Sequence, residues 1–117
     1  MAIDYAAKKL GEVVVAAMRS EQPLHLRLTG CICDLGPLSH HDHLPPDLKE
    51  RLDAIITACT REPDPTGGSL GTATATALKM DWQEVQQWLD KIQCLYEDVI
   101  AREQREKIAR EILAVRP

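Results

Sequence analysis

The 117-residue sequence predicts a single domain (residues 1–117) that is mainly helical, of the α+β class. Three observations lead to this prediction. Apolar residues recur every three or four positions through most of the chain, which is the spacing of amphipathic helices. One segment near residues 24–34 begins with a period of two, as half-buried strands do. Two aspartates are placed as helix N-caps. We therefore expect three to four helices, one short strand or β-hairpin near residues 24–34, and a long C-terminal helix.

The first helix is expected from Ile3 to about Arg19 and should end before Pro23. Its predicted apolar stripe is Ile3, Ala7, Leu10, Val14 and Met18. The next segment, Leu24–Thr29, alternates apolar and polar residues, and residues 30–33 either extend the strand or turn it into a hairpin. Because a lone hairpin is marginal in water, this strand must pair within residues 24–38 or with another subunit.

Two Pro- and Gly-containing loops are expected, at residues 34–46 and 61–71. Between them Asp47, with Glu50 three positions later, predicts an N-cap. The buried stripe of that helix is predicted to be Leu48, Leu52, Ile55, Ile56 and Cys59. Residues 72–80 alternate as a strand does, but they run directly into a helical pattern. We predict a helix there, and the strand remains the alternative.

Asp81 and Glu84 repeat the capping signal and begin the last helix, from Trp82 to about Val115. An unbroken helix of this length spans roughly 50 Å at 1.5 Å per residue. A domain of this size has a radius of gyration of only about 13 Å. Either the helix breaks near residues 101–104 or its end packs on another chain. We predict the second, a homo-oligomer, and the 3% aromatic content agrees, because a core poor in aromatics gains from burial against a second subunit.

The composition excludes several classes of protein. The formal net charge of −4 argues against binding extended nucleic acid, which requires a basic surface. No apolar run approaches the roughly 20 residues that cross a bilayer, so we expect no membrane insertion. The first residues lack the order of a signal peptide. Four cysteines without an export signal are expected to be reduced thiols in the cytoplasm.

A metal site is one hypothesis for the cysteines and histidines. Cys31, Cys33, His40 and His43, with His41 and Cys59 nearby, supply ligand types that zinc prefers. The spacing matches no strong zinc signature, because no C-x2-C is present. The alternative is that the cysteines are small buried apolar residues and the histidines lie in a solvated loop.

Catalysis is not predicted. Ser39, His40, Asp42 and His43 include the residue types of a triad, but neighbours in one loop point in divergent directions. A pair formed by Cys31 and a histidine stays open, without any motif to support it.

The Gly-rich loop before residue 72 is the best candidate for a small ligand. Glycines allow close approach of the backbone, and the N–H groups at a helix start favour phosphate. The site would use Thr66, Gly67, Gly68, Ser69, Gly71 and Thr72, with Arg61 on the approach and Arg102, Arg105 and Arg110 reaching it from a partner chain. No lysine follows as in a P-loop, so nucleotide hydrolysis is not implied. The alternative is an ordinary flexible loop.

These observations favour a small, non-enzymatic regulatory protein that acts by occupying a partner or ligand. An inhibitor or adaptor needs only an exposed acidic or apolar surface, and small inhibitors of mobile elements have this size and charge. A sequestering protein would hold a phosphate-bearing small molecule or signal nucleotide in the Gly-rich loop. Two alternatives are a zinc-stabilised interaction module and a small enzyme with a Cys/His site. The charged residues 102–110 are either a solvated helix face or a partner-binding one.

Overall fold

The computed structural model describes residues 2–40 and 43–115, and these residues form five α-helices. The helices are α1 (Ala2–Arg19), α2 (Leu24–Ser39), α3 (Pro46–Cys59), α4 (Thr72–Lys79) and α5 (Trp82–Ala114). The described part of the chain contains no strand, so the α+β class and the count of three to four helices are both wrong. The prediction of a helix over residues 72–80 is confirmed for Thr72–Lys79, and Met80 is extended.

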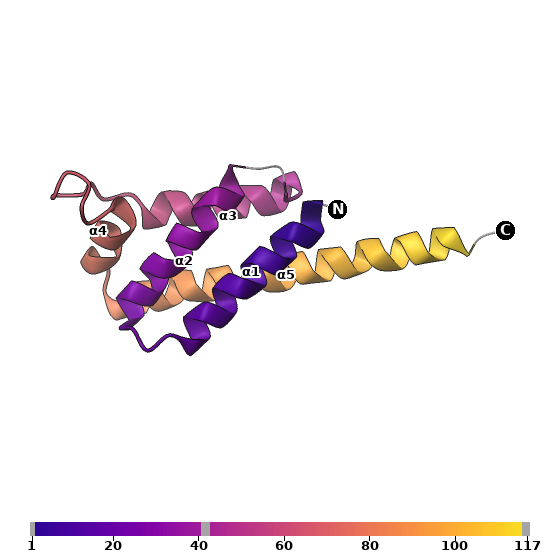
Figure 1. Ribbon diagram of the computed structural model, residues 1–117, viewed down its shortest axis with the longest axis horizontal. Coiled ribbons are helices and arrows are strands. Elements are labelled where there is room, and N and C mark those ends of the chain that lie inside the picture. The colour runs from indigo at the N-terminus through magenta and orange to yellow at the C-terminus, as the bar shows by residue number, and fades with distance from the viewer. Residues whose placement is uncertain (1, 41–42, 116–117) are drawn as a thin grey trace.

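Helix α5 is the axis of the molecule (Figure 1). Helices α1, α2 and α3 pack along its first two thirds, and α4 with its preceding loop closes one end. The last turns of α5 continue past the other helices into solvent. The molecule measures 63 × 25 × 19 Å, with a radius of gyration of 16.2 Å. This exceeds the roughly 13 Å of a compact chain of similar size because α5 does not break.

The segment predicted as a strand or hairpin is helix α2. Its buried residues are Leu28, Cys31, Ile32, Leu35 and Leu38, spaced as one face of a helix. The carbonyl of Pro23 accepts the N–H groups of Leu26 and Arg27 and so starts the first turn. The period of two covered only residues 24–29. The prediction failed because α2 packs against α1, α3, α4 and α5, and burial of its longer helical stripe overrides a short local pattern.

The two capping predictions had different outcomes. Asp81 caps α5, because its Oδ1 accepts the N–H of Glu84 at 2.7 Å. Helix α3 instead begins at Pro46, with Pro45 at the N-cap position. Asp47 is therefore a first-turn residue, and its carboxylate pairs with the Arg102 guanidinium at 2.8 Å. A proline suits this place because its missing N–H is not needed in the first turn.

The core lies between α1, α2, α3 and the first two thirds of α5. Leu10, Leu35, Leu52 and Leu95, one from each helix, are completely buried. The predicted stripe of the first helix is buried except at its end, where the side chain of Met18 is 76% exposed. None of the described helices combines the length and the apolar character needed to cross a membrane.

Candidate interaction surface

The Gly-rich loop closes around one of its own carboxylates. Asp64 Oδ1 accepts the N–H and the hydroxyl of Thr66 at 2.8 and 2.6 Å, and Oδ2 accepts the N–H of Gly71 at 2.7 Å. Thr66 Oγ1 in turn accepts the N–H of Leu70. Gly71 has φ +90°, a backbone conformation that favours glycine. The Thr66 hydroxyl and these N–H groups lower the pKa of Asp64 to about 2.

The Asp64 carboxylate binds loop N–H groups that the sequence analysis assigned to a phosphate ligand. Gly67 and Gly68 both have positive φ, and Ser69 is exposed at the loop surface. The N–H groups of Thr66 and Gly71, which the predicted site would use, are already bound to Asp64. Phosphate binding by residues 66–72 stays a prediction that no contact in the described structure supports.

The predicted arginines do not gather at this loop within one chain. Arg61, two residues after the end of α3, donates to Glu84 Oε2 at 2.9 Å, which raises the pKa of Arg61 and lowers that of Glu84. Arg102 lies in the second half of α5, where its guanidinium pairs with Asp47. Arg105 is exposed there. Their contribution to a ligand site from a partner chain also stays a prediction.

The predicted metal ligands do not come together either. Cys31 is buried in α2 and Cys33 is exposed two residues later, because successive helix positions face different directions. The His43 ring lies 4.4 Å from that of Tyr5, and His40 ends α2. The residues the structure describes contain no group of three His, Cys, Asp or Glu side chains placed to hold a metal ion. His41 and Asp42 lie outside the described residues.

Burial also makes two of the thiols unreactive. It raises the pKa of Cys31 to about 11 and that of Cys59 to about 12. Both are therefore protonated near neutral pH, whereas metal ligation and nucleophilic attack use the thiolate. The alternative interpretation of the cysteines holds for Cys31, which is a core residue, but not for Cys33, which is exposed. Cys59 is buried, as the stripe of its helix predicted.

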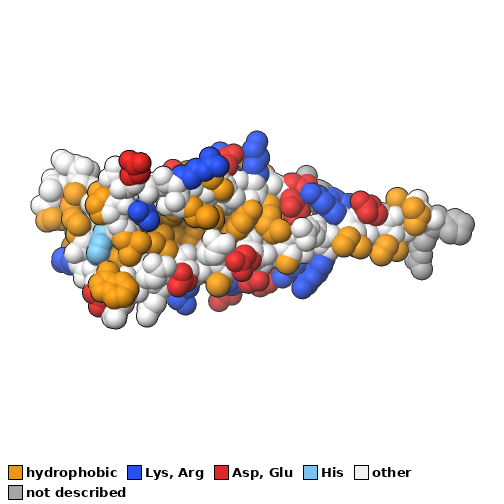
Figure 2. Space-filling model, turned by 90° about the horizontal axis from the view of Figure 1, so that it is seen from below, with side chains coloured by type: hydrophobic (Ala, Val, Ile, Leu, Met, Phe, Trp, Pro, Cys, Tyr) orange, Lys and Arg blue, Asp and Glu red, His pale blue; other side chains and the backbone are white. Residues whose placement is uncertain are grey.

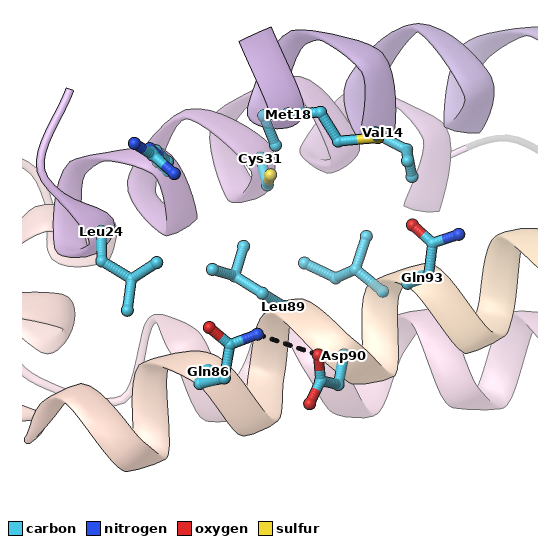
Figure 3. Close-up of a pocket in the computed structure, with 11 residues that line it drawn as sticks. Val14, Met18, Leu24, Cys31, Gln86, Leu89, Asp90 and Gln93 are labelled. Carbon is cyan, nitrogen blue, oxygen red and sulfur yellow. Dashed lines mark hydrogen bonds between the residues drawn. The ribbon is translucent and has the colours of Figure 1, made fainter. Parts of the chain in front are cut away.

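An apolar groove of about 230 Å³ runs between α1, α2 and α5 (Figure 3). Leu89 of α5 points across it toward Cys31 of α2, and Leu24 faces it from the first turn of α2. Val14 and Met18 border it from α1. The apolar lining is Val14, Ala17, Met18, Leu24, Cys31, Leu89 and Ile92.

The rim of this groove carries both signs of charge. Arg27 of α2 and Asp90 of α5 both line it, and Asp90 accepts a hydrogen bond from Gln86 at 2.9 Å. Figure 2 shows the long face of the molecule on which apolar side chains gather along the middle, with acidic and basic groups around them. Met18 is the most exposed apolar lining residue of the groove.

The end of α5 forms a second exposed apolar surface. From Lys107 to Val115, which we call the projection, every residue is exposed. Ile108, Ile112 and Val115 are 56%, 57% and 80% exposed. Their spacing of four and three residues places them on one face of the helix, the tail stripe. Apolar side chains also colour the narrow end of the molecule in Figure 2.

The tail stripe does not continue the core-facing side of α5. Val99 is completely buried, and Ile108 follows it by nine residues, which is about two and a half turns. The two side chains therefore point in opposite directions. Contacts agree with this geometry, because Asp47 and Asp4 reach α5 at Arg102 and Glu103, on the bundle side. Helix α5 therefore carries two apolar stripes, on opposite faces.

No protein-family model matches the chain, and no curated protein and no solved structure matches it. The candidate surface therefore rests on its own geometry.

Proposed function

We propose that the chain is a non-enzymatic, regulatory binding protein that holds an amphipathic helix of a partner protein in the groove between α1, α2 and α5. The observation that carries the proposal is the position of Met18, which is 76% exposed beside apolar residues of three helices. A flexible methionine at a groove edge adapts to the side chains of a partner and is typical of helix-binding surfaces.

The size of the groove favours a protein partner over a whole small molecule. Pockets for drug-sized ligands usually measure about 300–1,000 Å³, and this groove measures about 230 Å³. It suits one anchoring side chain from a helix that continues along the surface. Arg27 and Asp90 on the rim would give a partner helix of mixed charge a preferred orientation.

We also propose that the protein is cytoplasmic, because of its cysteines. All four cysteines are free, and Cys33 and Cys94 are exposed. Exposed free thiols are typical of proteins in a reducing compartment.

Site-specific crosslinking tests the groove directly. A photoreactive amino acid at position 18 should capture a partner in cells that express the protein, because this side chain borders the groove. The matched control is position 15, since Val15 is 44% exposed on the same helix but does not line the groove. Equal capture from both positions, or none from position 18, would contradict the proposal.

A substitution then measures the contribution of the groove. Once the captured partner is purified, Met18→Asp should weaken its binding roughly 10- to 30-fold, as expected for an apolar anchor position. Val15→Asp should leave the affinity within about twofold, because surface changes outside the contact matter little. The partner's contacting segment should be helical, with apolar residues three and four positions apart.

A further inference from the structure

The projection of α5 presents an apolar face with nothing packed on it. Ile108, Ile112 and Val115 lie on the side of the helix away from the bundle. Neither α1 nor α3 reaches it, because both helices begin near the level of Arg102 and Glu103. Three apolar residues on one face of the projection, each more than half exposed, exceed the scattered apolar residues of an ordinary surface.

We propose that the tail stripe binds the tail stripe of a second copy of this chain, with the two α5 helices antiparallel. This pairing is independent of the groove and of the function proposed for it. The partner is a second copy of the chain. The charges beside the stripe favour this partner and the antiparallel orientation of the two helices.

The charges flanking the stripe are self-complementary when the helices run antiparallel. Lys107 and Glu111 lie on the same flank of the stripe, one turn apart. A two-fold axis beside Ala109 brings Lys107 of each copy level with Glu111 of the other. The antiparallel arrangement keeps this flank on the same side of both helices, so two reciprocal ion pairs form. Ile108 of each copy then lies next to the axis, with Ile112 outside it.

Parallel pairing is opposed by acidic residues on the same face. Asp90 and Glu97 precede Ile108 by 18 and 11 residues, which are about five and three turns, so both lie in line with the tail stripe. Parallel helices would set each of these exposed carboxylates against its own copy, and like charges repel. Antiparallel helices overlap only at their ends and leave the two bundles apart, at opposite ends of the dimer.

The overlap is short, so the dimer should be weak and dependent on concentration. With the axis beside Ala109, the overlap runs from Glu103 to Val115, which is about three and a half turns, and contacts of this size fall below the roughly 1,200 Å² of stable interfaces. Analytical ultracentrifugation of the full chain should show a reversible monomer–dimer equilibrium. Ile112→Asp should shift the chain to monomer at concentrations where the wild type is dimeric.

The matched control lies one residue further on. Leu113 is 63% exposed, but it points to the bundle side of α5, away from the tail stripe. Leu113→Asp places the same charge at the same end of the helix, so its dipole cost is equal. It should leave dimerisation within about threefold of the wild type. Far-UV circular dichroism should show both variants as helical as the wild type.

A mixing experiment tests the antiparallel direction. Lys107→Glu and Glu111→Lys should each prevent self-association, because each homodimer would oppose two like-charged pairs. An equimolar mixture of the two variants should associate again, since each glutamate then meets a lysine of the other chain. Effects within one helix cannot be restored by mixing.

Three results would overturn the proposal. One is a wild-type chain that stays monomeric through the millimolar range. Another is equal loss of dimer in Leu113→Asp and Ile112→Asp. The third is a mixture that stays monomeric while the wild type dimerises. None of these results bears on crosslinking from position 18, so failure of the dimer and failure of the groove are separate outcomes.

Discussion

The two ends of this molecule differ in whether their side chains have partners within the chain. At the α4 end, Asp64, Thr76 and Asp81 are all bound to backbone groups of their own chain. At the other end, α5 leaves Ile108, Ile112 and Val115 in solvent. The α4 end satisfies its polar groups internally, and the projection carries apolar surface that only another molecule can cover. This difference is why both of our proposals use the projection and the groove and neither uses the Gly-rich loop.

The largest difference between the ends should appear when an apolar side chain is shortened. Met80 at the end of α4 is 4% exposed, whereas Ile112 is 57% exposed. Met80→Ala should lower the free energy of unfolding by about 2–5 kcal/mol, because it leaves a cavity in the core. Ile112→Ala should change it by no more than about 0.5 kcal/mol. Urea unfolding at concentrations where the chain is monomeric compares the two, and equal losses would contradict the distinction.

A smaller effect is expected from a buried hydroxyl at the α4 end. Thr76 is fully buried, and its Oγ1 accepts the N–H of Glu62 at 2.9 Å and donates to the Thr72 carbonyl. Thr76→Val keeps the shape but leaves the Glu62 N–H without its acceptor, which should cost about 1–3 kcal/mol. The exposed Thr72 serves as control, and Thr72→Val should be nearly neutral. A neutral Thr76→Val would mean that water replaces the hydroxyl.

The start of α5 should be sensitive to loss of its cap. Asp81→Ala removes the acceptor of the Glu84 N–H and should cost about 1 kcal/mol. Asp81→Asn keeps an acceptor oxygen and should recover most of that loss. Thermal unfolding followed by circular dichroism measures both variants. If Asn were as destabilising as Ala, the hydrogen bond would not be the source of the effect.

The smallest expected effect is local and depends on pH. The pKa of Asp64 falls from its ordinary 3.8 to about 2 in the folded loop. Since the folded pKa is depressed, the carboxylate stabilises the loop above pH 4, and this contribution is lost as the pH falls through about 2. Amide exchange at Gly71, corrected for intrinsic rates, should accelerate between pH 4 and pH 2. Asp64→Asn should remove this dependence.

Local signals in the sequence were sufficient for some elements and misleading for others. Asp81 was identified as a cap because capping depends on residues within one turn. The period of two in Leu24–Thr29 predicted a strand, but the buried residues of α2 continue with helical spacing to Leu38. Asp64 was missed although an aspartate before Pro-Thr-Gly is a recognisable turn signal. Together with the glycines, that signal could have predicted that the Asp64 carboxylate binds the N–H groups of the loop.

The groove was beyond sequence reasoning because its residues are distant in the chain. Met18, Leu24 and Leu89 come from three helices, and no local pattern shows that they meet. Met18 was predicted only as the last residue of the apolar stripe of the first helix. Its exposure depends on how α1, α2 and α5 pack around the groove, which is a property of the packed bundle.

By itself the sequence determined the long last helix, its cap and the mainly helical character, since these follow from hydrogen bonds and periodicity within a few turns. Only the tertiary structure decided that residues 24–39 are a helix, that α5 continues unbroken past the bundle, and that its last apolar stripe faces away from the core. The physical reason is that the spacing of apolar residues along a helix is a local property. Whether an apolar face is buried depends on which other helices lie near enough to cover it.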